Sequence, residues 1–133
     1  MSMTEDRLTL STIDKSIAGK RILSDISFSV GKNEIVGLLG PNGAGKTTAF
    51  YIAAGLLFPD KGCVEIDGQI VTDLPMHKRS LVGLSYLPQE ASIFHDLTVE
   101  ENLRGIAELR INTQKDQISF FDMVVNEFGL EDL

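Results

Sequence analysis

Apolar and polar residues alternate over much of the first third of the chain. The alternation is clear at residues 8–11 and again at 26–30, and a period of two is typical of strands that bury one face. A second pair of such segments, 64–66 and 69–71, flanks Asp67-Gly68, a dipeptide that accepts the positive φ angles of a tight hairpin turn. Together these segments predict an antiparallel β layer.

Two apolar runs predict strands of a different kind. Residues 35–39 and 82–87 are largely apolar without regular alternation, as expected of strands covered on both faces in a parallel sheet. Between them, residues 47–57 are apolar on most faces and are stopped by Pro59, which is the pattern of a buried helix. A glycine-rich loop joins the first of these strands to the helix.

The remaining segments predict helices. Pro75 suits the first turn of a short helix over 76–79, because its fixed φ angle matches that position. Thr98 and Glu101 fit a capping box that opens a helix over 99–110. A last helix over about 116–128 ends at a glycine in position 129. With the β layer, these helices make the fold class α/β.

Length and composition are typical of one globular domain that stays in the cytosol. The chain has 133 residues, of which 43% are hydrophobic and 23% charged, and no stretch approaches the roughly 20 apolar residues of a membrane helix. The first six residues are polar and acidic, unlike a secretory signal. The single cysteine, Cys63, lies in an alternating segment and is interpreted as a strand residue.

The charge distribution argues against nucleic acid as a partner. The net charge is −7, and residues 90–133 carry ten acidic but only three basic residues, whereas residues 1–89 carry nine of each. A protein that grips a nucleic-acid backbone usually presents a basic patch. No nucleic-acid partner is therefore expected.

The segment 40–47 reads G-x-x-x-x-G-K-T, and each part of that spacing suits a bound triphosphate. Glycines let backbone N–H groups converge on a phosphate. Lys46 adds a positive charge beside the β- and γ-phosphates, Thr47 offers a hydroxyl to Mg²⁺, and the following helix adds the positive end of its dipole. The predicted ligands are a triphosphate and Mg²⁺, held by the loop residues Gly40, Pro41, Asn42, Gly43, Ala44, Gly45, Lys46 and Thr47.

A phosphate loop alone does not distinguish kinases, GTPases and transporter ATPases. Residues 38–48, however, resemble the Walker A segment of ABC-transporter ATPases, 86–90 resemble their Q-loop, and 97–103 the segment that opens their helical subdomain. Residues 49–51 and 88–94 are most similar to the ATPase subunits of lipopolysaccharide exporters. The resemblance extends from about residue 8 to 133.

The resemblance implies a P-loop NTPase core of ABC type with an N-terminal antiparallel β layer and the start of a helical subdomain. Residues 1–133 would be a partial, truncated nucleotide-binding domain, with core and β layer over about 1–89 and the helical start over about 90–133. The implied function is to couple ATP binding and hydrolysis to substrate movement across the inner membrane, most similar to lipopolysaccharide export. Alternatives are a branched-chain amino-acid importer ATPase and a truncated nucleotide-binding module without activity.

By the same resemblance, the full-length protein would be a homodimer bound to transmembrane subunits on the cytoplasmic face of the inner membrane. Thr48 would join the phosphate site, and Gln89 would contact Mg²⁺ and the attacking water. Ile17 stands where the family usually carries an adenine-stacking aromatic residue. The signature motif, the Walker B strand and the switch histidine are not found in residues 1–133, so this chain alone is expected not to hydrolyse ATP.

Overall fold

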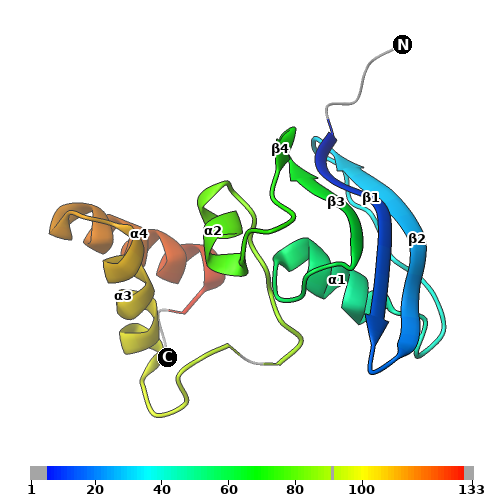
Figure 1. The fold of residues 1–133 in the computed structure, drawn as a ribbon. Helices are drawn as coiled ribbons and strands as arrows, with labels where there is room; N and C mark the ends of the chain where they lie inside the picture. Colours follow the sequence, from blue (N-terminus) through cyan, green and yellow to red (C-terminus); the bar gives the residue numbers. More distant parts are fainter. Residues whose placement is uncertain (1–5, 91, 131–133) are drawn as a thin grey trace. The chain divides into compact units, whose positions relative to one another are not determined.

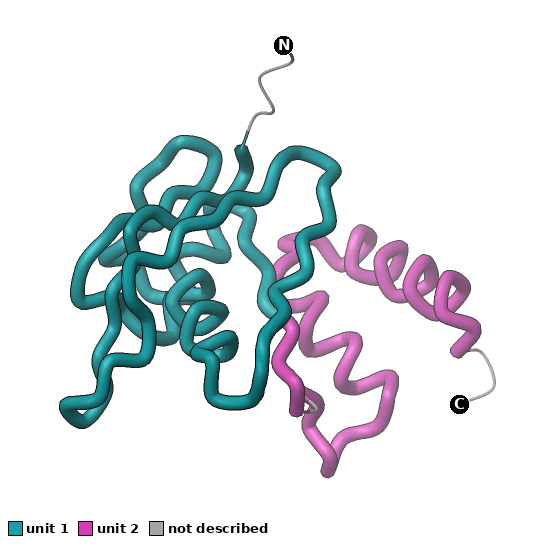
Figure 2. Tube along the Cα trace, turned by 90° about the vertical axis from the view of Figure 1, so that its right-hand side faces the viewer, with its two compact units in different colours: residues 1–86 teal, residues 87–133 magenta. Residues whose placement is uncertain are grey.

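The computed structural model describes residues 6–90 and 92–130. By their contacts the residues divide into two compact units, Met1–Tyr86 and Leu87–Leu133 (Figure 2). The first unit carries the β layer, the glycine-rich loop and two helices, and the second carries a pair of helices. Each unit is described by itself below.

Four strands of the first unit form one antiparallel sheet in the order β2-β1-β3-β4 (Figure 1). Their bounds are β1 (Asp6–Ile17), β2 (Lys20–Gly31), β3 (Lys61–Ile66) and β4 (Gln69–Ile70). Leu10 of β1 lies opposite both Phe28 and Val64, so the apolar positions of three strands share one face. The antiparallel layer predicted from the alternation is confirmed.

Helix α1 (Lys46–Ala54) covers this apolar face. Ala49, Ile52 and Ala53 are buried with the inward side chains of the sheet. The predicted helix over 47–57 is too long, because Gly55 adopts a left-handed conformation with φ of 78° and ends the helix before Pro59 is reached. The core contains Leu10, Ile13, Leu23, Ala49, Ile52, Ala53, Val64, Ile66 and Val71.

A fully buried arginine connects the end of α1 to helix α2 (Met76–Leu81). Arg79 Nη1 donates to the carbonyls of Ile52 and Ala53, the latter at 2.8 Å. Its Nε donates to the Leu74 carbonyl at 2.8 Å and its Nη2 to the Thr72 carbonyl at 2.9 Å. Burial lowers the pKa of the guanidinium, and the charge of Asp73 opposes that shift. The side chain therefore caps the last carbonyls of α1, where a cation also interacts favourably with the helix dipole.

The two predicted parallel strands are wrong for this structure. Residues 35–39 and 82–87 have no strand conformation, and Ile35, Leu39 and Leu87 are 99%, 93% and 90% exposed. A strand exists only through a hydrogen-bonded neighbour, and among the described residues nothing pairs with either segment. The apolar character of these runs indicates burial, not strand conformation. Leu38 and Leu84 are partly buried and pack against the core.

The second unit consists of α3 (Val99–Arg110) and α4 (Gln114–Phe128). The predicted helix over 99–110 is confirmed, and the Thr98–Glu101 capping box is present. The Arg104 guanidinium lies 4.8 Å from the centroid of the Phe121 ring, which joins the two helices by a cation–π contact. Neither these helices nor the others in the described ranges are long and apolar enough to cross a membrane.

The hydrogen bonds of Arg79 to four carbonyls, called the Arg79 clamp below, predict a large loss of stability when the guanidinium is removed. Arg79→Met would take the arginine donor from the carbonyls of Ala53, Leu74 and Thr72, while the Ile52 carbonyl would keep the Gly55 N–H. The loss should lower the free energy of unfolding by at least about 3 kcal/mol. Lys78→Met, an exposed change on the same helix, should stay within about 0.5 kcal/mol of the unaltered chain. Urea denaturation measures both, and equal stability of the two variants would contradict the clamp.

The capping box predicts that the start of α3 depends on pH. Hydrogen bonds from the Thr98 backbone N–H and hydroxyl lower the pKa of the Glu101 carboxyl. A depressed folded-state pKa means that this stabilisation is present above the unfolded pKa of about 4.3 and is lost as pH falls through the folded value. Amide exchange at the first turn of α3 should therefore accelerate in acid, whereas Glu101→Gln, whose amide oxygen also accepts, should show no such pH dependence.

Candidate functional site

The loop over residues 40–45 turns the chain into α1. Gly43 and Gly45 have φ angles of 83° and 89°, values that side-chain-bearing residues rarely adopt. The Ala44 N–H donates to the Pro41 carbonyl at 3.2 Å, and the Ala49 N–H donates to the Gly45 carbonyl at 2.9 Å. The glycines of the motif thus allow the loop to curl and pass directly into the helix.

Gly45 is also required by packing against β2. A Cβ atom at this position would lie 2.6 Å from Leu23 Cδ2 and 3.1 Å from the Ile22 carbonyl oxygen. Gly43 meets no atom within 4 Å, so its requirement is conformational alone. The loop is consequently fixed against the sheet at Gly45 and open to solvent at Gly43.

The first turn of α1 presents backbone donors at the end of this loop. The N-cap is Gly45, which makes no side-chain capping hydrogen bond, and the first turn holds no acidic residue. The first N–H groups of a helix lack partners within it and lie at the positive end of its dipole. This arrangement is suited to an anion such as a phosphate.

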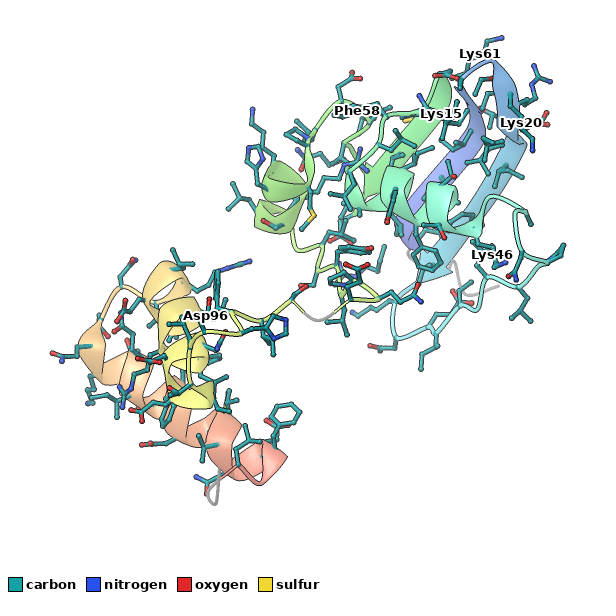
Figure 3. The ribbon with its side chains drawn as sticks, turned by 90° about the horizontal axis from the view of Figure 1, so that it is seen from below. Lys15, Lys20, Lys46, Phe58, Lys61 and Asp96 are labelled. Atoms are coloured by element: carbon teal, nitrogen blue, oxygen red, sulfur yellow. The ribbon has the colours of Figure 1, made fainter. Side chains whose placement is uncertain are left out.

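Lys46 folds back over its own loop. Its Nζ donates to the carbonyls of Gly40 at 2.6 Å and Pro41 at 2.8 Å. Figure 3 shows Lys46 apart from Lys15, Lys20 and Lys61, which gather at another part of the first unit. Lys46 is therefore the positively charged residue of the loop. A phosphate could replace the two carbonyls as the hydrogen-bond acceptor of the Lys46 ammonium group.

The other predicted site residues are placed as follows. Thr47 is exposed and Thr48 half-buried in the first turn of α1, and Asn42 is exposed in the loop. Ile17 ends β1 and pairs with Lys20 across the hairpin turn, with 45% of its surface exposed. Gln89 is exposed and belongs to the second unit. The structure therefore places residues 40–48 together at the start of α1 and Ile17 and Gln89 elsewhere in the chain, and the roles of all these residues stay predictions.

Sequence reasoning missed Arg79, which anchors the far end of the helix that begins at Lys46. The sequence around it, Lys78-Arg79-Ser80, looks like an exposed turn of a short helix. Its burial arises because Thr72, Leu74 and the end of α1 converge on it. No local pattern carries that information, since the partners lie between 5 and 27 residues before Arg79 in the chain.

These features fit a triphosphate site. Three features are typical of phosphate-binding loops. The loop has glycines of positive φ, the helix after it starts without a side-chain cap, and Lys46 donates to the carbonyls of the loop. The sequence profile described as ABC transporter matches residues 23–133. The chain belongs to the ABC-transporter family of ATP-binding proteins.

Individual relatives share this assignment. The chain is 48% identical over 124 residues to the lipopolysaccharide export system ATP-binding protein LptB of Haemophilus influenzae, covering 92% of this chain and 52% of that protein. It is 46% identical to LptB of Escherichia coli, covering 83% and 46%. A probable ABC transporter ATP-binding protein of Azorhizobium caulinodans is 44% identical, covering 95% and 45%. The chain spans about half the length of these relatives.

Solved structures show the same fold. An ATP-binding subunit of an ABC transporter superposes with a TM-score of 0.76 at 30% identity, covering 93% of this chain and 51% of that one. A nucleotide-free ATP-binding cassette from an ABC transporter superposes with a TM-score of 0.70 at 26% identity, covering 86% and 46%. The α/β fold of the ABC ATPase domain is thereby shown for this chain.

The two loop glycines predict different costs of adding a methyl group. Gly43→Ala should lower the free energy of unfolding by about 1–2 kcal/mol, because the positive φ is strained but the space is open. Gly45→Ala should cost more, because its Cβ must also displace Leu23. Denaturant titration of the two variants measures this order, and equal costs would contradict the packing of the loop on β2.

Proposed function

We propose that residues 40–48 bind the phosphates of Mg-ATP and that this binding serves an ABC transporter. The observation that carries the proposal is the loop itself, in which two glycines of positive φ, a helix start without a side-chain cap and Lys46 follow one another. This arrangement supports binding of an anion. Backbone N–H groups would hold the phosphates and Lys46 would add the counter-charge. Family membership supports ATP as the nucleotide.

Thr47 and Gln89 are the residues proposed to hold Mg²⁺. A threonine hydroxyl and an amide oxygen are both ligands suited to a hard divalent cation, and both side chains are exposed. Bound Mg²⁺ would offset the negative charge of the phosphates. Gln89 would also orient the attacking water. Ile17 would lie against the adenine, where an aliphatic side chain offers no ring for stacking.

Lipopolysaccharide export is the transport function that the comparisons favour. Two relatives at 46–48% identity are named as lipopolysaccharide export ATP-binding proteins, which supports this cargo over that of an amino-acid importer. In such a system the complete protein would act as a homodimer on the cytoplasmic face of the inner membrane, paired with transmembrane subunits.

The second unit is proposed to be the start of the helical subdomain and to contact those subunits. Ile93, Phe94 and Leu97 are 58%, 66% and 45% exposed. The Asn102 side chain ties their loop by accepting from the Phe94 N–H at 2.8 Å and donating to the carbonyls of Phe94 at 3.0 Å and Thr98 at 2.9 Å. An apolar loop that is exposed and fixed by hydrogen bonds supports a contact with another protein.

The 133-residue chain by itself is proposed to bind ATP without turnover. Hydrolysis requires a positioned water and stabilised charge on the transferred phosphoryl group. This sequence supplies Lys46, Thr47 and Gln89, whereas the family's remaining elements for this step are not found in residues 1–133.

Isothermal titration with Mg-ATP tests the proposed site. Lys46→Ala should weaken binding by at least about tenfold, because a charge-assisted contact to phosphate is lost. Lys61→Ala, a lysine of the same unit that lies apart from the loop (Figure 3), should bind like the unaltered chain. Mg-GTP should bind within a few-fold of Mg-ATP, since Ile17 provides little base discrimination.

A phosphate-release assay at saturating Mg-ATP completes this test. The unaltered chain should release no more phosphate than Lys46→Ala. Equal affinity of the Lys46 and Lys61 variants would refute the proposed binding site. Turnover near one per second, a common enzymatic rate, would instead refute binding without hydrolysis.

A further inference from the structure

The hairpin formed by β1 and β2 is irregular before it reaches its turn. The pairing of the two strands shifts register twice between Leu10 and Lys15. Thr12 and Asp25 have positive φ angles of 50° and 51°, so each strand holds one irregular residue in this region. Bulges of this kind bend a strand and re-aim its side chains. The regular ladder alone therefore does not position residues 14–25, which are called the hairpin tip below.

Asp60 attaches the hairpin tip to the loop that follows α1. One carboxylate oxygen accepts from Lys15 Nζ at 2.8 Å, and the other accepts from the Ser16 backbone N–H at 2.6 Å. The Asp60 N–H donates to the Asp14 carbonyl at 2.8 Å. One residue thus binds three successive residues of β1. These hydrogen bonds are called the Asp60 latch below.

The Asp60 latch is partly shielded from solvent. The Lys15 side chain is only 15% exposed, whereas that of Asp60 is 46% exposed. The hydrogen bonds from Lys15 and the Ser16 N–H lower the pKa of the Asp60 carboxyl, and hydrogen bonds to a charged carboxylate are stronger than neutral ones. A Cβ atom on Gly62 would lie 2.5 Å from the Ser11 carbonyl oxygen, so the chain after Asp60 also runs directly against β1.

The hairpin tip also touches the start of α1. A Cβ atom on Gly45 would lie 2.6 Å from Leu23 Cδ2, so these two residues are in close contact. Leu23 pairs with Lys15 across the hairpin. Ile17 lies two residues beyond Lys15 and pairs with Lys20 at the turn. The hairpin tip therefore extends from the glycine-rich loop to Ile17 within the first unit.

The geometry points to Asp60 as a positioning residue that fixes the hairpin tip, and with it Ile17, for the base of a bound nucleotide. The carboxylate holds the backbone N–H of Ser16, the residue directly before Ile17. Ile17 is 45% exposed, so its side chain has apolar surface that a flat base can cover. This inference rests on the proposed function, because Ile17 needs a defined place only if the base lies against it.

The contribution of the base to affinity tests the positioning role. The quantity measured is the ratio of the dissociation constant of Mg-tripolyphosphate to that of Mg-ATP, by calorimetry on the whole chain. Both ligands carry a triphosphate, so the ratio isolates the base and ribose. Asp60→Ala should lower this ratio by roughly two- to fivefold, the effect of losing about 20–40 Å² of apolar contact. An unchanged ratio would overturn the inference.

Asp67→Asn is the matched control. Asp67 pairs with Arg7 at 2.7 Å, and its side chain is 47% exposed, close to the value for Asp60. Arg7 lies at the opposite end of β1 from Ile17. Asparagine tolerates the positive φ of 49° at position 67. This variant also removes one negative charge and should leave the ratio unchanged, whereas a loss equal to that of Asp60→Ala would contradict the positioning role.

Two further variants separate positioning from general damage. Asp60→Asn keeps an oxygen that accepts from the Ser16 N–H, and it should lower the ratio by less than Asp60→Ala. Asp60→Ala combined with Ile17→Ala should be no worse than Ile17→Ala alone, because Asp60 acts through Ile17. Additive losses in the double variant would show that Asp60 acts by another route and would overturn the inference.

The Ile17 methyl groups report the base contact directly. An aromatic ring shifts the NMR signals of methyl groups that lie against its face. Mg-ATP should therefore shift the Ile17 methyl signals of the unaltered chain, and Mg-tripolyphosphate should leave them in place. In Asp60→Ala the shift caused by saturating Mg-ATP should become smaller.

The levels of the proposal fail differently. If Lys46→Ala binds both ligands like the unaltered chain, the proposed phosphate site fails and the inference fails with it. If the phosphate site holds but Mg-ATP leaves the Ile17 methyl signals unshifted, the role of Ile17 fails and the positioning role with it. If the signals shift equally in the unaltered chain and in Asp60→Ala, only the positioning role is overturned.

Discussion

Burying a guanidinium costs free energy unless its donors are satisfied, and in the first unit four backbone carbonyls satisfy those of Arg79. Two of these carbonyls end α1, and the others belong to the chain that follows β4 (Figure 1). A Cβ atom on Gly55 would lie 2.8 Å from Arg79 Nε, so the helix must end there on a glycine. Because a helix is stiff, fixing the last turn of α1 also fixes its first turn, where the glycine-rich loop of residues 40–45 ends.

The opposite end of α1 is constrained by shape rather than by charge. Gly45 combines a positive φ with a close approach to Leu23, so the loop can enter the helix only along this path. Lys46 then donates to the carbonyls of Gly40 and Pro41, which keeps its ammonium group against the loop. The helix is thus held at one end by Arg79 and at the other by packing on β2. Such preorganisation supports the proposed phosphate binding, because a site that is already formed costs less free energy to fill.

Some elements can be predicted from the sequence and others cannot. The difference is whether the interacting residues lie close together or far apart in the chain. The Thr98–Glu101 box and the Asp67-Gly68 turn are satisfied by residues three or fewer positions apart, so reading the sequence predicts them correctly. Residues 35–39 and 82–87 show the limit, because their apolar character signals burial while strand formation needs a distant partner. Among the described residues neither segment has such a partner, and Ile35 and Leu87 are exposed.

The glycine-rich loop, the antiparallel layer and the helices of the second unit are predictable from the sequence alone, because spacing, alternation and capping depend on neighbouring residues. The sequence also carries the resemblance that predicts membership of the ABC family. The tertiary structure is needed to show that Arg79 is buried at the end of α1, that Gly45 packs on Leu23, and that Tyr51 meets Tyr86. These contacts join segments 22 to 35 residues apart, and chain folding alone brings such segments within reach.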